Sequence, residues 1–111
     1  MGIPLHQAKA ELFRTMGHPV RVRVLELLQE RPLAVHELLA EIDVEASNLS
    51  QQLGVLRRAG LVASAREGST VRYTLATSDV SDVMTAARRI LTELLSDRQD
   101  LLSELRAAEH A

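Results

Sequence analysis

The stretch SNLSQQLGVLRRAGLV, residues 47–62, decides the fold of this chain. Placed on a helix at 100° per residue, Leu49, Leu53 and Leu56 fall on one side. The opposite side carries serine, glutamine, glycine and arginine, where a merely solvated face would favour lysine and glutamate. We therefore predict a helix over about residues 45–59 that buries its leucines and offers a polar face to a close neighbour.

The polar face of this helix suits the DNA major groove. Gly54 costs about 1 kcal/mol relative to alanine in a helix interior, and the small residues beside it leave room for a neighbour. Glutamine and asparagine can present a paired donor and acceptor to adenine, and serine can bond a base or a phosphate. We predict that this face reads base edges. The alternative is a neutral solvated face, because exposed glutamine is common.

The flanking segments predict a small, mainly helical domain with a β-hairpin. Apolar spacing predicts a first helix over residues 5–16, and Pro19 suits the first turn of a second helix because it has no N–H to lose there. His18 is expected to cap or pack at that start. A short third helix is expected at roughly residues 34–41, and alternation around the turn EGST predicts a hairpin over about residues 61–75. The side chains expected to face the core here are Val20, Val24, Leu27, Leu28, Leu38, Leu39 and Ile42.

The last segment predicts a long helix with an apolar stripe. It runs from about Ser78 to about Ala107, roughly 45 Å at 1.5 Å per residue. Its heptad seam consists of Val80, Met84, Ala87, Leu91, Leu94, Arg98, Leu101 and Leu105, interrupted only by the arginine. Because this stripe exceeds the partners available in so short a chain, we predict dimerisation through the helix. A helix packed wholly inside one monomer is the alternative.

Composition narrows the classes of function. The chain of 111 residues is 46% apolar and 25% charged, which suits one globular domain. No stretch reaches the roughly 18 continuous apolar residues of a membrane span, and the first residues lack the apolar centre of a signal peptide, so we expect a cytoplasmic protein without a membrane partner. The chain has no cysteine, which excludes disulfides, thiolate metal sites and cysteine nucleophiles. No phosphate loop, zinc-protease motif or catalytic triad context is present either, so an enzyme is not expected.

Charge is distributed unevenly along the chain. The net formal charge is −2, which does not suit a protein that simply coats nucleic acid. Residues 45–75 nevertheless carry four arginines against two glutamates, and this basic part coincides with the polar helix and the hairpin. A dimer would double the phosphate contacts that these arginines make and would bind DNA with a strong salt dependence.

At this point the sequence resembles a known family. The segments LFRTMGHPVRVRVLELL, HELLAEI, SNLSQQLGVLRRAGLV and REGSTVRYTL are similar to the ArsR/SmtB family of bacterial transcriptional repressors, over roughly residues 8–77. The resemblance implies a single winged helix-turn-helix domain over residues 1–111, with a recognition helix at about 45–59, a wing at about 61–75 and a dimerisation helix at about 78–107. It further implies a homodimer that binds a double-stranded DNA operator near a promoter.

Carried over onto this chain, the resemblance places DNA-binding residues in the recognition helix and the wing. Gln52 stands where many relatives have histidine, and by helical angle it lies nearer the core edge, so Gln51 is the better candidate for reading bases. The predicted DNA-binding residues are Ser47, Asn48, Ser50, Gln51, Gln52, Arg57, Arg58, Arg66, Thr70 and Arg72. The predicted dimer interface, from the first and last helices, comprises Leu5, Leu12, Val83, Met84, Ala87, Leu91, Leu94 and Leu101.

The effector is where the sequence departs from the family. Many relatives sense metals through a Cys-x-Cys pair on the third helix, but Ala34 and His36 occupy the corresponding positions here. The last helix has no histidine before His110, so the family's zinc site on that helix is not supported either. His6 could still join carboxylates of the last helix across a dimer and hold nickel, cobalt or zinc through nitrogen and oxygen ligands. His36 and His110 are the other metal candidates, and a metal-independent regulator or a protein-interaction module controlled by a partner protein is the alternative.

Overall fold

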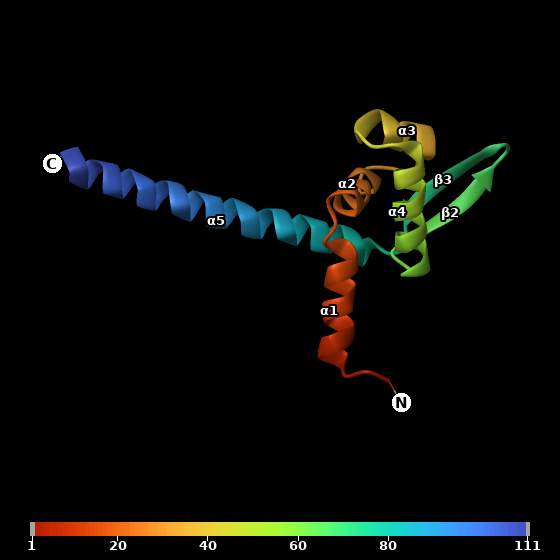
Figure 1. Cartoon of the computed structure of the whole chain (residues 1–111), viewed down its shortest axis with the longest axis horizontal. Coiled ribbons are helices and arrows are strands. Elements are labelled where there is room, and N and C mark those ends of the chain that lie inside the picture. Colours follow the sequence, from red (N-terminus) through yellow and green to blue (C-terminus); the bar gives the residue numbers. More distant parts are fainter. Residues whose placement is uncertain (1, 111) are drawn as a thin grey trace. The chain divides into compact units, whose positions relative to one another are not determined.

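The computed structural model describes residues 2–110, which form a mainly helical chain with a small sheet (Figure 1). Its elements are α1 (Leu5–Met16), α2 (Pro19–Leu28), β1 (Leu33–Ala34), α3 (Val35–Glu41), α4 (Ala46–Arg58), β2 (Val62–Glu67), β3 (Thr70–Leu75) and α5 (Ser78–His110). The chain divides into two compact units, one ending at Ser81 and the other beginning at Asp82, within α5. The predicted boundaries of α1 and of the recognition helix agree with the structure to within one residue.

The core of the first unit is built from aliphatic side chains of α2, α3 and α4. Leu49, Leu53 and Leu56 of α4 are each at most 1% exposed, which confirms the predicted buried face. In α2 the buried residues are Val24, Leu25 and Leu28, whereas Leu27, which we predicted to face the core, is only half-buried. Leucines therefore fix α4 against α2 and α3, and its polar side is left outside.

The start of α2 follows the predicted cap. His18 precedes Pro19, the first helical residue, and its Nδ1 accepts a hydrogen bond from the backbone N–H of Val20 at 3.2 Å. This bond satisfies one of the N–H groups that have no partner at the start of a helix. His18 is thus a capping residue, as expected.

The sheet contains a third strand that the sequence did not predict. Antiparallel β2 and β3 form the expected hairpin, and β1 adds to the other edge of β3, with Leu33 opposite Tyr73. The helix that follows begins at Val35, because Ala34 belongs to β1. A strand of two residues is too short to show an alternating pattern, so only the structure reveals it.

Residues 2–81 have the winged helix-turn-helix fold. α3 and α4 form the helix-turn-helix, and the hairpin of β2 and β3 forms the wing, which extends from the side of α4 in Figure 1. Gly60, with φ of 80°, provides the left-handed turn between α4 and β2, and Gly68, with φ of 63°, provides the turn at the tip of the wing. No helix among residues 2–110 combines the length and apolarity that crossing a bilayer requires.

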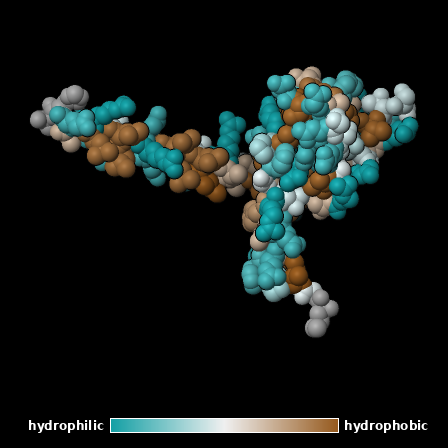
Figure 2. Space-filling view, in the orientation of Figure 1, coloured by the Kyte–Doolittle hydropathy of each residue, from teal (hydrophilic) through white to brown (hydrophobic). Residues whose placement is uncertain are grey.

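Helices α1 and α5 both carry exposed apolar side chains. In α1, Leu5 is 70% exposed and Phe13 is 61% exposed. In α5, patches of apolar surface follow the helix (Figure 2), and its exposed aliphatic residues are Ile90, Leu91, Leu94, Leu95, Leu101, Leu102 and Leu105. Beyond its first turns, in residues 82–109 taken by themselves, α5 has no buried side chain, and dimerisation through this helix and packing inside one monomer stay the two alternatives.

Candidate DNA-binding site

The outer face of α4 is polar, exposed and free of acidic residues. Ser47, Ser50 and Gln51 are exposed on it, and Arg57 and Arg58 are exposed in the last turn. A Cβ atom at Gly54 would lie 3.0 Å from Nη1 of Arg58, so the missing side chain lets that guanidinium lie over the helix. The face thus offers hydroxyl and amide groups for base edges and arginines for phosphates.

A chain of hydrogen bonds joins α4 to α2 and to the end of α1. Arg21 donates from Nε to the carbonyl oxygen of Thr15 at 2.7 Å and from Nη1 to Oε1 of Gln52 at 3.0 Å. Gln52 in turn donates from Nε2 to Oδ1 of Asn48 at 3.0 Å. We call these three side chains, Arg21, Gln52 and Asn48, the amide relay. No local pattern in the sequence predicts the amide relay, because Arg21 and Gln52 lie on different helices.

The relay changes the expected role of Gln52. We predicted that this residue contacts DNA, but it is only 8% exposed and both ends of its amide are bonded within the chain. Burial therefore argues against a direct contact, in line with its helical angle near the core edge. Gln51, its neighbour, is exposed and keeps the predicted position for reading bases.

The wing presents one exposed arginine and one that is neutralised. Arg66 of β2 is exposed, whereas Arg72 of β3 makes ion pairs with Glu37 at 2.9 Å and Glu67 at 3.2 Å. Of the two, Arg66 is better placed to meet phosphate, because the charge of Arg72 is already compensated. The predicted Thr70 is half-buried at the start of β3.

Glu37 anchors the base of the wing to α3. Its Oε1 accepts the backbone N–H of Ala34 at 2.9 Å and pairs with Arg72, and its Oε2 pairs with Arg31 at 2.9 Å. These bonds, first from the Ala34 N–H and then from Arg31, hold the pKa of Glu37 at about 2, well below its usual value of 4.5. Glu37 is therefore ionised at neutral pH and ties α3 to β1 and β3.

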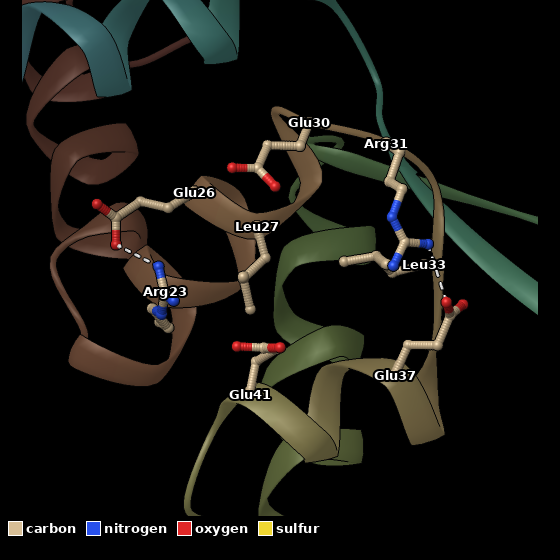
Figure 3. A pocket seen from close by; sticks show the side chains of 8 residues that line it. All are labelled: Arg23, Glu26, Leu27, Glu30, Arg31, Leu33, Glu37 and Glu41. Carbon is tan, nitrogen blue, oxygen red and sulfur yellow. Dashed lines mark hydrogen bonds and ion pairs between the residues drawn. The ribbon is translucent and has the colours of Figure 1, made fainter.

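The pocket beside Glu37 has the wrong charge for phosphate (Figure 3). Arg23 points to Glu26 and Arg31 to Glu37, so both of its arginines are paired with carboxylates. Its lining residues are Arg23, Glu26, Leu27, Glu30, Arg31, Leu33, Glu37 and Glu41. With more glutamates than arginines, this pocket carries a negative charge that does not suit a phosphate.

Among the described side chains, the candidate metal ligands His6 and His36 do not belong to a common cluster of ligands. His6 is exposed on α1 and His36 is exposed on α3, and the side chain of His110 lies outside the described residues. Among the residues that the structure describes, no three histidine or carboxylate side chains form a group that could hold a metal ion. A site of nitrogen and oxygen ligands for nickel or zinc, formed across a dimer, stays a prediction.

A helix-turn-helix with an exposed polar second helix, beside a wing that presents an exposed arginine, is typical of a DNA-binding transcriptional regulator of the winged-helix class. Residues 18–64 match the family model of the bacterial regulatory proteins of the arsR family. The chain is also 50% identical over 109 residues to the uncharacterized HTH-type transcriptional regulator Rv0081 of Mycobacterium tuberculosis, covering 97% of this chain and 96% of that protein. The chain belongs to the ArsR family, and it is a transcriptional regulator rather than an enzyme.

Solved structures of related regulators share the fold. The crystal structure of Rv0081 superposes with a TM-score of 0.81 at 51% identity, covering 87% of this chain and 98% of that one. The transcriptional repressor BigR from Xylella fastidiosa gives a TM-score of 0.72 at 34% identity, covering 77% of this chain and 87% of that one. HlyU from Vibrio cholerae, named a transcriptional activator, gives a TM-score of 0.71 at 35% identity, covering 79% of this chain and 97% of that one.

Proposed function

We propose that this regulator binds a double-stranded DNA operator as a homodimer, with α4 in the major groove and the wing beside it. The observation that carries the proposal is the two-sided character of α4. Its leucines are completely packed, while Ser47, Ser50 and Gln51 face outward with no acidic residue among them. A rigid helix that displays donors and acceptors of this kind is what direct readout of bases requires.

Exposed apolar surface supports the homodimer. Seven large aliphatic residues of α5 are between 50% and 59% exposed in the single chain, and Leu12 of α1 is 39% exposed. Apolar stripes of this length are stabilised by a partner, and a second copy offers the same stripe to an isologous contact. Two-fold symmetry would place two α4 helices on half-sites about one helical turn of DNA apart.

The proposed outcome of binding is repression where the operator overlaps the promoter. Relatives of this chain are named as repressors and as activators: BigR is called a repressor and HlyU an activator. We expect the position of the operator relative to the promoter, rather than the recognition helix, to set the sign of regulation.

Replacing Gln51 with alanine tests the reading face. We expect Gln51→Ala to weaken binding of the cognate operator by about 1 to 3 kcal/mol, or roughly 5- to 150-fold, because a bidentate amide contact to a base is lost. Electrophoretic mobility shift with a fixed duplex measures the change. Gln99→Ala, the same substitution at an exposed position of α5 outside the heptad seam, is the control and should bind as the parent does. If Gln51→Ala binds the operator with the affinity of the parent protein, the outer face of α4 does not read bases through Gln51.

A further inference from the structure

We infer that the amide relay fixes the direction of the Asn48 amide, so that Asn48 acts toward the operator as a hydrogen-bond donor. Its target is then an acceptor atom of DNA, on a base edge or on a phosphate. This inference rests on the proposed function and goes beyond it, because it states which chemical groups one residue of α4 accepts and which it rejects.

The direction is set at Arg21, which can only donate. A guanidinium has five N–H donors and no acceptor, whereas a glutamine amide can face a neighbour with either its oxygen or its nitrogen. Arg21 is held by its bond to the Thr15 carbonyl and reaches Gln52 at 3.0 Å. The oxygen of the Gln52 amide must therefore face Arg21, and its nitrogen must face the other way.

The same logic passes from Gln52 to Asn48, one turn earlier on α4. Gln52 is buried and its Nε2 is the donor toward Asn48, so Asn48 must turn its Oδ1 to meet it at 3.0 Å. The Nδ2 group of Asn48 is then the part left to point away from the relay. Asn48 is half-buried between the exposed Ser47 and the buried Leu49, at the edge of the reading face. An asparagine without such a relay could rotate its amide to suit either kind of base.

A donor at this position selects among bases. In the major groove guanine offers the acceptors N7 and O6, thymine offers O4 and adenine offers N7, whereas cytosine offers only the N4 amino donor. The paired contact that asparagine makes to adenine needs both amide ends, and here Oδ1 is turned to Gln52. If it reaches a base, Asn48 therefore accepts guanine, thymine or the N7 of adenine and rejects cytosine. If it reaches a phosphate oxygen instead, it adds affinity without sequence preference.

Replacing Gln52 with glutamate reverses the relay. Both oxygens of a glutamate accept hydrogen bonds, so one would pair with Arg21 and the other would require Asn48 to turn its Nδ2 inward. In Gln52→Glu the outward atom of Asn48 becomes Oδ1, an acceptor. Binding is measured with duplexes that carry each of the four bases at each operator position. At one position per half-site the preferred base should shift from guanine or thymine to cytosine, by about tenfold.

Two further variants separate this effect from added charge or lost stability. In an Asn48→Ala background Gln52→Glu should leave base preferences unchanged, because the residue that turns is gone. Asn48→Asp keeps the relay and also presents an acceptor outward, in the first turn of α4 where a negative charge is favourable. It should produce the same shift as Gln52→Glu. If Gln52→Glu lowers the affinity for all DNA sequences equally, and this loss of affinity disappears in the Asn48→Ala background, the acceptor is a phosphate.

Side-chain amide NMR tests the direction without DNA. In the free protein the Gln52 amide hydrogens should exchange slowly with water and those of Asn48 quickly, and Gln52→Glu should protect the Asn48 amide. The reverse pattern in the parent protein would overturn the inference. A second result would overturn this inference and leave the proposed function standing. In that case the parent protein discriminates between DNA sequences, Gln52→Glu has the same base preferences as the parent, and Asn48→Ala does not alter the effect of Gln52→Glu. A parent with no sequence preference at all would overturn the proposed function and this inference together.

Discussion

Replacing Leu94 with glutamate is expected to weaken operator binding about 100-fold or more by preventing dimerisation. Leu94 lies on the heptad seam of α5 and is 50% exposed in the single chain. A carboxylate at the centre of an apolar interface would be buried without a partner, which strongly disfavours association. A monomer carries one recognition helix instead of two linked ones, so affinity for a two-half-site operator should fall about 100-fold or more.

Analytical ultracentrifugation and anisotropy with labelled operator measure the two effects of Leu94→Glu. The control is Gln99→Glu, which adds the same charge to an exposed position of the same helix outside the seam. It should remain dimeric and bind normally. A Leu94→Glu protein that stays dimeric and binds with parental affinity would contradict the assignment of α5 as the dimer interface.

Replacing Leu25 with alanine is expected to lower the free energy of unfolding by about 2 to 5 kcal/mol. Leu25 is fully buried in α2, so the truncation removes apolar contacts and leaves a cavity in the core of the first unit. Such a loss is a large fraction of the stability of a small domain. Urea denaturation followed by circular dichroism, at one fixed protein concentration, measures it.

Leu27→Ala is the matched control for this core substitution. Leu27 lies in the same helix but is half-buried, so the same truncation should cost clearly less than at Leu25. Equal losses from the two variants would mean that α2 packs in a different rotation from the one described.

The contrast between Leu25 and Leu27 shows that sequence periodicity does not always predict which side of a helix is buried. Apolar residues occupy nearly every side of α2, so the pattern alone cannot decide which of them the core receives. In α4 the apolar residues occupy one side only, and Leu49, Leu53 and Leu56 are buried as predicted. A clean amphipathic pattern thus predicts orientation, whereas a helix rich in valine and leucine on all sides needs its tertiary neighbours.

Some features of the polar residues of the candidate DNA-binding site could likewise be predicted from the sequence, and others could not. The exposed position of Gln51 follows from helical angle, and so does the tendency of Gln52 toward the core. The partners of Gln52 do not follow, because Arg21 belongs to another helix and its reach depends on how α2 packs on α4. The compensation of Arg72 by Glu37 has the same origin, since 35 residues separate the two along the chain. Contacts between distant segments are what local patterns leave out.

Fluorescence anisotropy with DNA from upstream of the protein's own gene tests most directly whether α4 and the wing bind a specific operator. We predict tight binding to this duplex and much weaker binding to a shuffled one. We also predict an affinity that falls steeply between about 50 and 200 mM salt, because arginines of two wings and two recognition helices release counterions from phosphates. Equal affinity for the shuffled duplex, or binding indifferent to salt, would contradict this prediction and favour a protein-interaction module.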